Sequence, residues 1–429
     1  MLSNDLRKLI ARLQNPTQFV KNVGNTAAIQ TISLIVSIGN AVIIARWLGP
    51  DGKGIVQLAL LAPAILGLFL NGGIGVANVY YTGNKQYNVA TLTANASAFT
   101  LIGTVGGLIF FVIFLTTGAA ESVLQGVPLW LLFLALTGFP IALLTGYLST
   151  ILQGLQQIYQ LNWIRLAGSI TLFLFTVVTI AMLGFGIYAA VAASIASTLV
   201  TLLLLARELK KHDASFRPQY NRSVMRNTLK FGVRGYVGNV LQFFNYRLDV
   251  FILNYFLGPA SVGIYSVSVR LAELVWYFPN AVGFVIFPKA ASSSQEEMKR
   301  FTPQVFRTTL IISLVLGAGI AIVGKPLIRL VYTDAFITAF LPLLVLLPGA
   351  ILLGTAKVLT NDIAGRGFPQ YNSISSGLSL VLTVVFDLLL IPKLGILGAA
   401  LASSLSYLLT FCTAIFFYWK TKDLPNGTV

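Results

Sequence analysis

The stretch Leu48-Gly49-Pro50-Asp51-Gly52-Lys53-Gly54-Ile55 returns later in the chain as Leu257-Gly258-Pro259-Ala260-Ser261-Val262-Gly263-Ile264. Both copies follow the pattern LGP-x-x-x-GI, and they lie 209 residues apart (48 to 257). The same offset relates Gly186-Ile187 to Gly395-Ile396, and Gln160-x-Asn162 recurs close to it as Gln370-x-Asn372. Three matched pairs in the same order indicate a duplicated unit that covers most of the chain.

The composition is that of a membrane protein. Of 429 residues, 56% are hydrophobic and only 10% are charged, and the mean hydropathy is +0.82. No span alternates with the period of two that a β-barrel needs. We therefore predict an all-α polytopic membrane protein, in which twelve transmembrane helices form two parallel-repeat six-helix bundles around a central cavity. The predicted spans are about 22–48, 53–81, 89–117, 127–153, 162–183, 186–206, 228–257, 262–291, 303–324, 337–360, 370–391 and 395–418.

Polar segments divide the chain into predicted domains. These are a cytoplasmic surface segment at 1–21, an N-terminal lobe at 22–206, a linker at 207–227, a C-terminal lobe at 228–418 and a tail at 419–429. Lys and Arg gather in the loops on the side of the N-terminus, so both termini are expected in the cytoplasm and the protein in the cytoplasmic (inner) membrane. The net charge of +16 then reflects orientation and contact with anionic membrane lipids rather than nucleic acid binding.

Several chemistries are excluded by residue type. Cys412 is the only cysteine and His212 the only histidine, so neither a disulfide framework nor a Cys/His metal site is expected. The chain contains no Walker A motif and no G-x-S-x-G elbow. The sequence therefore predicts neither an enzyme nor a resident metal or cofactor.

Charged residues within spans are costly, so by default they mark a pathway or a binding site. Asp249 and Arg270 are each nine residues from the ends of the Gly258–Ser261 turn, which predicts that they face each other at matched depth. Glu273 is available to Arg270 or to Arg247. The alternative is that Asp249, Arg270 and Glu273 only neutralise one another. Arg234 and Arg247 have no obvious acidic partner, which favours a functional role for both.

Polar stripes accompany these charges. Asn239, Gln242, Asn245, Tyr246 and Asp249 share one helical face, and the span at 22–48 has a neutral counterpart that includes Gln30 and Asn40. By the 209-residue offset, Asn40 corresponds to Asp249 and Asn25 to Arg234. Such polar residues also serve as helix–helix contacts, which is the alternative for this stripe. Asp387 ends a further stripe, but its predicted place near the outer surface allows solvation.

The stretch Ala45-Arg46-Trp47-Leu48-Gly49-Pro50-Asp51-Gly52-Lys53-Gly54-Ile55 resembles the signature of the polysaccharide transporter family, which contains the O-antigen (Wzx-type) flippases. That family belongs to the multidrug/oligosaccharidyl-lipid/polysaccharide exporter superfamily. Further matches are Gln153-Gly154 with Asn162, and Ala364-Gly365-Arg366-Gly367 with Asn372. The resemblance implies two six-helix bundles, alternating access, and transfer of a polyprenyl-diphosphate-linked oligosaccharide from the inner to the outer leaflet for polysaccharide biosynthesis.

These implications assign roles to the polar residues of the spans. Arginine suits a diphosphate, and neutral amides and phenols suit sugar hydroxyls. The predicted substrate-binding residues are Arg234, Arg247, Arg270, Asn25, Gln30, Asn40, Asn239, Gln242 and Tyr246. Because no nucleotide site is present, Asp249 and Glu273 are the predicted ion-coupling residues. Arg46 is the predicted gate residue, with snorkelling to the membrane surface as the alternative.

Three other functions stay open. A cation-coupled drug exporter of the same superfamily usually needs a buried acid, and the spans of the first lobe contain none. A lipid II flippase of this superfamily typically has two further helices. A membrane scaffold for a polysaccharide synthase complex would not need unpaired intramembrane arginines. For the flippase, polysaccharide polymerase and glycosyltransferases are candidate partners besides the lipid-linked glycan and the membrane lipids.

Overall fold

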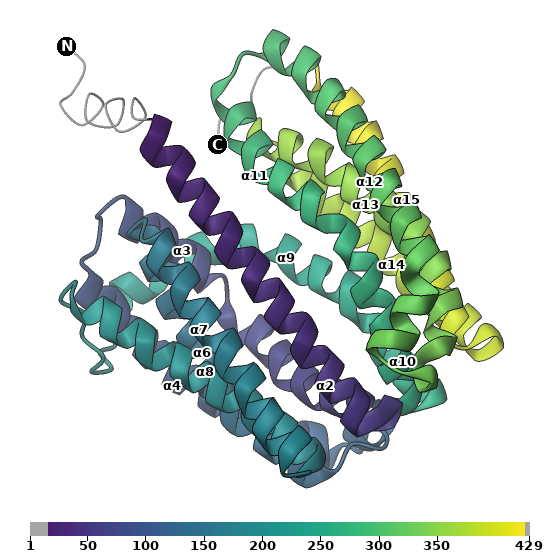
Figure 1. Cartoon of the computed structure of the whole chain (residues 1–429). Coiled ribbons are helices and arrows are strands. Elements are labelled where there is room, and N and C mark those ends of the chain that lie inside the picture. The colour runs from purple at the N-terminus through teal and green to yellow at the C-terminus, as the bar shows by residue number, and fades with distance from the viewer. Residues whose placement is uncertain (1–15, 425–429) are drawn as a thin grey trace, which may run out of the picture. The chain divides into compact units, whose positions relative to one another are not determined.

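The computed structural model describes residues 16–424, without the side chains of residues 16–28, 119, 122, 234, 235, 284, 288 and 292, and this part of the chain is helical with no strand (Figure 1). The first half contains α2 (Pro16–Asn71), α3 (Ile74–Gly83), α4 (Val89–Thr116), α5 (Ala119–Val123), α6 (Leu129–Gly154), α7 (Ile158–Thr176), the π-helical η1 (Val177–Met182) and α8 (Gly186–Lys210). The second half contains α9 (Arg222–Leu257), α10 (Pro259–Ala272), η2 (Glu273–Trp276), α11 (Tyr277–Ser292), α12 (Gln295–Val331), η3 (Asp334–Ala339), α13 (Phe340–Gly365), α14 (Pro369–Leu394) and α15 (Ile396–Thr421).

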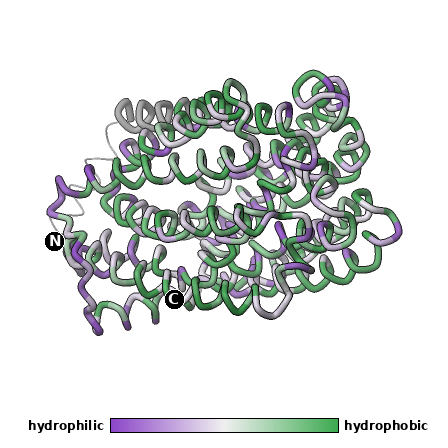
Figure 2. Tube along the Cα trace, turned by 90° about the horizontal axis from the view of Figure 1, so that it is seen from below, coloured by the Kyte–Doolittle hydropathy of each residue, from purple (hydrophilic) through white to green (hydrophobic). Residues whose placement is uncertain are grey.

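Hydrophobic residues predominate along the helices (Figure 2). Within the described residues, ten helices are long and apolar enough to cross a membrane. The first of them, Ile29–Asn71, contains a break at Gly49 that divides it into two of the predicted spans. The 36-residue α9 is outside these ten because its charged and polar residues lower its hydropathy. The all-α membrane fold is therefore confirmed, and the helices are consistent with twelve crossings.

The sequence repeat is visible in the backbone. Gly49 has φ 67° and ψ −174°, and its counterpart Gly258 has φ 77° and ψ 177°. This conformation is almost restricted to glycine, because a β-carbon would clash with the backbone there. The helices also correspond in length: α6 and α13 both contain 26 residues. The repeated LGP motif thus encodes the same sharp turn between two helices in each half.

The two LGP turns pack directly on each other. A β-carbon on Gly54 would overlap the carbonyl oxygen of Pro259, and a β-carbon on Gly263 would overlap that of Pro50. The contact is therefore reciprocal between equivalent residues of the two repeats. Lys53 Nζ adds a hydrogen bond to Ser266 Oγ. Because the motif has the same spacing in both repeats, both glycines lie where the two backbones meet.

The chain divides into two compact units. The first comprises residues 16–44, 63–109 and 133–233 of the described chain, and the second comprises residues 45–62, 110–132 and 234–424. In the first unit, the hydrophobic core includes Ala77, Leu92, Leu148, Leu161 and Leu205 from α3, α4, α6, α7 and α8. The segment 45–62 belongs to the second unit because of the contact between the turns. The lobe boundaries 22–206 and 228–418 stay a prediction.

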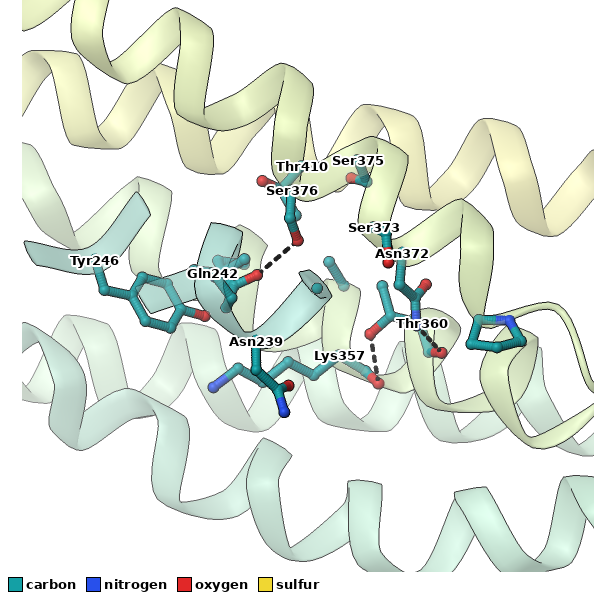
Figure 3. A pocket seen from close by; sticks show the side chains of 14 residues that line it. Asn239, Gln242, Tyr246, Lys357, Thr360, Asn372, Ser373, Ser375, Ser376 and Thr410 are labelled. Carbon is teal, nitrogen blue, oxygen red and sulfur yellow. Dashed lines mark hydrogen bonds between the residues drawn. The ribbon is translucent and has the colours of Figure 1, made fainter. Parts of the chain in front are cut away.

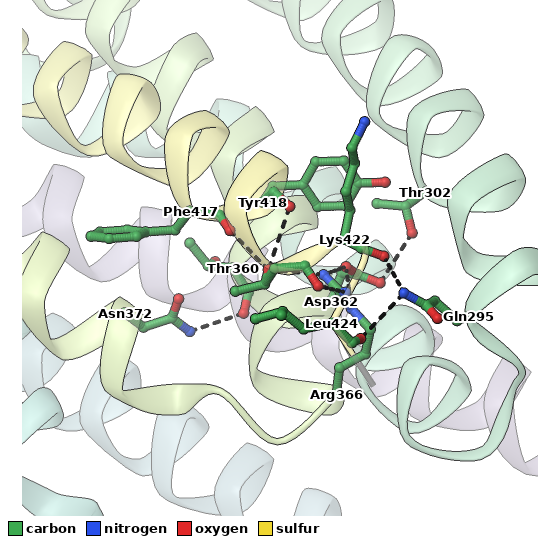
Figure 4. Close-up of polar contacts among 11 residues, drawn as sticks. Gln295, Thr302, Thr360, Asp362, Arg366, Asn372, Phe417, Tyr418, Lys422 and Leu424 are labelled. Atoms are coloured by element: carbon green, nitrogen blue, oxygen red, sulfur yellow. Dashed lines mark hydrogen bonds and ion pairs between the residues drawn. The ribbon is translucent and has the colours of Figure 1, made fainter. Parts of the chain in front are cut away.

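In the second unit, α9, α13, α14 and α15 bring polar side chains together around a pocket (Figure 3). The ends of α13 and α15 are held by a buried ion pair beyond this pocket (Figure 4). Arg366 Nη2 lies 2.8 Å from Asp362 Oδ2, and Arg366 Nη1 donates to the carbonyl oxygen of Thr421 at 2.8 Å. Thr302 of α12 donates to Asp362 Oδ1 at 3.1 Å. One buried pair thus ties α12, α13 and α15 together.

The C-terminal end is fixed by the same region. Gln295 Nε2 donates to the carbonyl oxygens of Lys422 and Leu424 at 2.7 and 3.2 Å. Lys299 Nζ lies 2.9 Å from Asp423 Oδ1, and this hydrogen-bonded ammonium holds the pKa of the Asp423 carboxyl below its usual value. These contacts keep the helices that carry the pocket in a fixed register.

We expect Gly54→Ala and Gly263→Ala to destabilise the protein by about 1–3 kcal/mol each, because the new methyl group overlaps backbone that cannot rotate away. Thermal unfolding in detergent measures this effect. Gly319→Ala in α12 is the matched control, since nothing lies within 4 Å of its β-carbon position. The control should be neutral or stabilising by up to about 1 kcal/mol. Equal unfolding temperatures for all three variants would contradict the close contact of the turns.

We expect Arg366→Met to cost about 3–5 kcal/mol, because it leaves the buried Asp362 carboxylate without its counter-charge. Arg329→Met is the matched control, since the Arg329–Asp334 pair at 2.6 Å has side chains that are 64% and 74% exposed. The control should cost less than about 1 kcal/mol. Denaturation of both variants tests the difference, and similar losses would show that burial of the Arg366 pair is not what matters.

Candidate functional site

The polar face of α9 opens into a pocket of the second unit. Asn239, Gln242 and Tyr246, three of the predicted substrate-binding residues, line it together with side chains of α13, α14 and α15 (Figure 3). Its volume is about 270 Å³. The remaining lining residues are Gly238, Leu353, Ala356, Lys357, Thr360, Pro369, Asn372, Ser373, Ser375, Ser376 and Thr410. A pocket with this many hydroxyl and amide groups is unusual among helices that are otherwise apolar.

Internal hydrogen bonds position the lining groups. Ser376 Oγ donates to Gln242 Oε1 at 2.9 Å, which joins α14 to α9. Asn372 Nδ2 donates to the carbonyl oxygen of Thr360 at 2.9 Å. The Tyr246 ring packs against Trp276, with the ring centroids 5.3 Å apart. These contacts hold a set of neutral donors and acceptors around the pocket, which is the chemistry that sugar hydroxyls need.

A layer of buried polar side chains continues from the pocket along α9. Asn245 Oδ1 accepts hydrogen bonds from Thr383 Oγ1 at 2.8 Å and from Ser406 Oγ at 3.1 Å. Ser379 Oγ and Thr410 Oγ1 are 2.6 Å apart. This layer explains the serine and threonine residues of α14 and α15, since each hydroxyl satisfies another buried polar group.

The partners of Asp249 differ from the prediction. Asp249 Oδ2 accepts hydrogen bonds from Tyr265 at 2.7 Å and from Ser403 at 3.3 Å, and no ion pair of the described residues joins Asp249 to Arg270. The predicted Asp249–Arg270 pair is therefore wrong. Tyr265 and Arg270 are five residues apart on α10, so they lie about 140° apart around that helix. Counting residues from the turn takes no account of this rotation, and the matched depth of Asp249 and Arg270 stays a prediction.

Arg247 has an acidic partner after all. Arg247 Nη1 lies 3.3 Å from Glu273 Oε1, with side chains that are 34% and 20% exposed. The expectation that Arg247 is unpaired is wrong, and the alternative in which Glu273 serves Arg247 across the helix pair is confirmed. Glu273, a predicted ion-coupling residue, is thereby engaged in an ion pair between α9 and η2.

Asp387 is completely buried, against the expectation that it is solvated near the surface. Neither of its carboxylate oxygens has a hydrogen-bond partner among the residues that the structure describes. It follows Thr383 by one turn of α14, so both face the same way. Burying an ionised carboxylate without a partner is very costly, which makes Asp387 a candidate functional residue. The stripe Asn372, Ser376, Ser379 and Thr383 was the signal in the sequence.

The remaining predicted residues are not among the described lining residues of the pocket. Gln30 is exposed on α2, and Asn40 Oδ1 is buried without a hydrogen-bond partner in the described part. The side chains of Asn25 and Arg234 are not among those described. Arg46 donates from Nε to the carbonyl oxygen of Val331 at 2.9 Å and from Nη2 to that of Leu330. Arg46 thus caps the end of α12, where a cation is favoured, and its gate role stays a prediction.

Comparison with known proteins adds the family. A family model described as "polysaccharide biosynthesis protein" matches residues 43–340. A putative O-antigen transporter of Shigella flexneri is 23% identical over 402 residues, which are 89% of this chain and 92% of that protein. The probable low-salt glycan biosynthesis flippase Agl15 of Haloferax volcanii is 25% identical over 52% of this chain and 46% of its own length.

An uncharacterised membrane protein of Methanocaldococcus jannaschii, MJ1068, is 24% identical over 65% of this chain. The chain spans 57% of that protein, and thus only about half the length of this relative and of the Haloferax flippase.

Solved structures share the fold. The inward closed conformation of the lipid II flippase MurJ matches with a TM-score of 0.77 and 16% identity, covering 92% of this chain and 87% of that chain. An inward-facing multidrug resistance transporter of the MATE family, from the MOP superfamily, matches with a TM-score of 0.70 and 17% identity, covering 91% and 94%. At these identities the likeness concerns the fold alone. The resemblance seen in the LGP motif is confirmed, and the chain belongs to the polysaccharide biosynthesis protein family of membrane proteins.

Proposed function

We propose that this protein is a flippase that moves a polyprenyl-diphosphate-linked oligosaccharide from the inner to the outer leaflet of the cytoplasmic membrane, with both of its own termini in the cytoplasm. The supporting observation is the pocket around Asn239, Gln242 and Tyr246, in which polar groups of α9 meet those of three helices long and apolar enough to cross a membrane. Polar groups at this position are expensive unless a polar cargo uses them. Family membership and the names of the relatives agree with a role in glycan transport.

Alternating access is supported by contacts between the two repeats at opposite ends of their helices. At one end, the Pro50–Gly54 and Pro259–Gly263 turns meet within the second unit. At the other, Gly73 meets the backbone of Gly232 within the first unit. The Tyr80 ring stacks on that of Phe231 beside this contact, with centroids 4.5 Å apart. For a headgroup to enter from one side and leave on the other, these two contacts have to open in turn.

One feature of the structure supports the alternative function of a drug exporter, and another opposes it. The buried carboxylates of Asp249 and Asp387 suit a cation-coupled cycle. The charged residue among the described lining of the pocket, however, is a lysine, which repels organic cations. We therefore favour the glycan flippase, and we keep cation coupling at the buried carboxylates as part of the proposal.

We place the coupling site at Asp249, as the sequence predicts, and add Asp387, because both carboxylates are buried in the same unit. Asp249 has two hydroxyl donors, whereas Asp387 has no described hydrogen-bond partner. A sodium ion or a proton at Asp387 would remove the cost of a bare buried carboxylate. Entry of one charge is worth about 2.3 kcal/mol per 100 mV of membrane potential, which supplies a driving force without ATP.

In reconstituted vesicles, we expect the wild-type protein to transfer a fluorescent polyprenyl diphosphate bearing a hexose between leaflets. The double variant Asn239→Ala, Gln242→Ala should transfer it roughly tenfold more slowly, because two hydrogen bonds of about 0.5–1.5 kcal/mol each are lost. Gln304→Ala is the control, since Gln304 is exposed on α12 away from the pocket. No transfer by the wild type argues against the flippase, and an unimpaired double variant argues against the pocket.

We expect Asp387→Asn to raise the unfolding temperature in sodium-free buffer, because the amide removes a buried charge. Added sodium should stabilise the wild type by mass action but not the variant. Asp334→Asn controls for surface effects, because the Asp334 side chain is 74% exposed. The measurement is thermal unfolding against sodium at constant ionic strength, repeated at two pH values. A response to neither sodium nor pH in the wild type would remove the coupling site and leave the flippase proposal standing.

A further inference from the structure

Among the described residues that line the pocket, one is charged: Lys357, which the sequence did not single out as a binding residue. Lys357 lies on α13 and lines the pocket together with Asn239 of α9 (Figure 3). Every other described residue of the lining is neutral. Among the described lining residues, this ammonium is therefore the group that carries a charge able to attract an anion.

Neutral groups hold the Lys357 ammonium in place. Lys357 Nζ donates to Asn280 Oδ1 at 2.8 Å and lies 4.4 Å from the centre of the Trp276 ring. The indole is itself fixed, because Trp276 Nε1 donates to the carbonyl oxygen of Ala350 at 2.9 Å. An amide oxygen and an aromatic face attract a cation without neutralising it. The side chain is thus oriented for binding while its charge is kept.

No carboxylate in the described part of the chain lies within ion-pair distance of Lys357. Glu273, an acid of the neighbouring helical segment, is engaged by Arg247 at 3.3 Å. A partly buried cation without a counter-charge is unfavourable in a medium of low dielectric constant, and an incoming anion removes that cost. An ammonium has three donors, of which Asn280 takes one.

We propose that Lys357 anchors an anionic group of the cargo, and that the pocket holds one sugar-sized polar unit next to that anion. This inference rests on the proposed flippase function. The shared chemistry is an oxyanion beside sugar hydroxyls, which fits either a phosphate of the diphosphate linker or the carboxylate of an acidic sugar. At about 270 Å³, the pocket is smaller than the roughly 300–1,000 Å³ of drug-sized sites, so it takes one unit of the cargo rather than a whole oligosaccharide.

The neutral lining groups complete the site. Asn239, Gln242 and Asn372 contribute amides, and Ser373 and Ser376 contribute hydroxyls, to the lining of the same pocket. An anion at Lys357 would place the ring that carries it among these groups. The lysine then sets which charge is accepted, and the amides and hydroxyls set the orientation of the ring.

The transport test compares wild type, Lys357→Met and Lys357→Arg in vesicles with two probes. One is a polyprenyl diphosphate bearing a neutral hexose, and the other bears glucuronic acid. If Lys357 binds phosphate, Lys357→Met should slow both probes about tenfold or more. If it binds the sugar carboxylate, only the acidic probe should slow. Lys357→Arg should retain more transport than Lys357→Met. Lys325→Met is the control, since Lys325 is exposed on α12.

A binding test in detergent separates this inference from the flippase function. Tryptophan fluorescence is followed while inorganic pyrophosphate or glucuronate is added, because an anion at Lys357 lies beside the Trp276 ring. The wild type should respond saturably to at least one of the two, and Lys357→Met and Trp276→Phe should not. The role of Lys357 would be overturned if Lys357→Met transported both probes at the wild-type rate. It would also be overturned if the wild-type protein showed no saturable response to either anion. Failed wild-type transport with intact anion binding would instead count against the flippase.

Discussion

The close approach of two backbones, with no room for a side chain between them, is the constraint on which the second unit depends. Gly54 and Gly263 each lie against the carbonyl oxygen of the proline that opens the other repeat's turn. Both turns need glycine a second time, at Gly49 and Gly258, for a conformation that other residues avoid. Because the contact uses equivalent residues, one duplicated motif provides both surfaces, as in an isologous interface. It is also a small contact, which two helical hairpins can break and remake.

A second constraint is that each polar group placed among apolar helices needs a partner. The structure satisfies most of them in layers. Arg366 and Asp362 neutralise each other at one end, Arg247 and Glu273 pair beside the pocket, and Asn245 collects the hydroxyls of Thr383 and Ser406. Several buried polar atoms lack a hydrogen-bond partner in the described part, and two charged residues stand out. The Lys357 ammonium contacts a neutral amide and an aromatic ring without an ion pair among the described residues, and Asp387 has no described hydrogen-bond partner. These two groups are where a cargo anion and a coupling cation would complete the structure.

Sequence periodicity predicted the faces of helices well and their neighbours poorly. The LGP repeat predicted the duplicated turn, and the stripe Asn239, Gln242 and Tyr246 predicted the α9 side of the pocket. Residue counting predicted equal depth for Asp249 and Arg270. The direction in which each side chain points, however, depends on the rotation of its helix. In the structure, Tyr265 and Ser403 donate hydrogen bonds to Asp249 instead. Lys357 stood out only as a charged residue within a span, because the neighbours that orient it, Asn280 and Trp276, lie far from it in sequence.

The central claim is that the two LGP turns separate during each transport cycle, and a reversible cross-link between them tests it most directly. Lys53 and Ser266 touch across this contact, and replacing the only cysteine, Cys412, by serine gives a background for Lys53→Cys and Ser266→Cys. A short bis-maleimide linker with a cleavable disulfide would join the two positions in reconstituted vesicles. We predict that transfer of the lipid-linked sugar stops on cross-linking and returns after cleavage. Transfer by the cross-linked protein at the rate of the uncross-linked double variant would contradict the account.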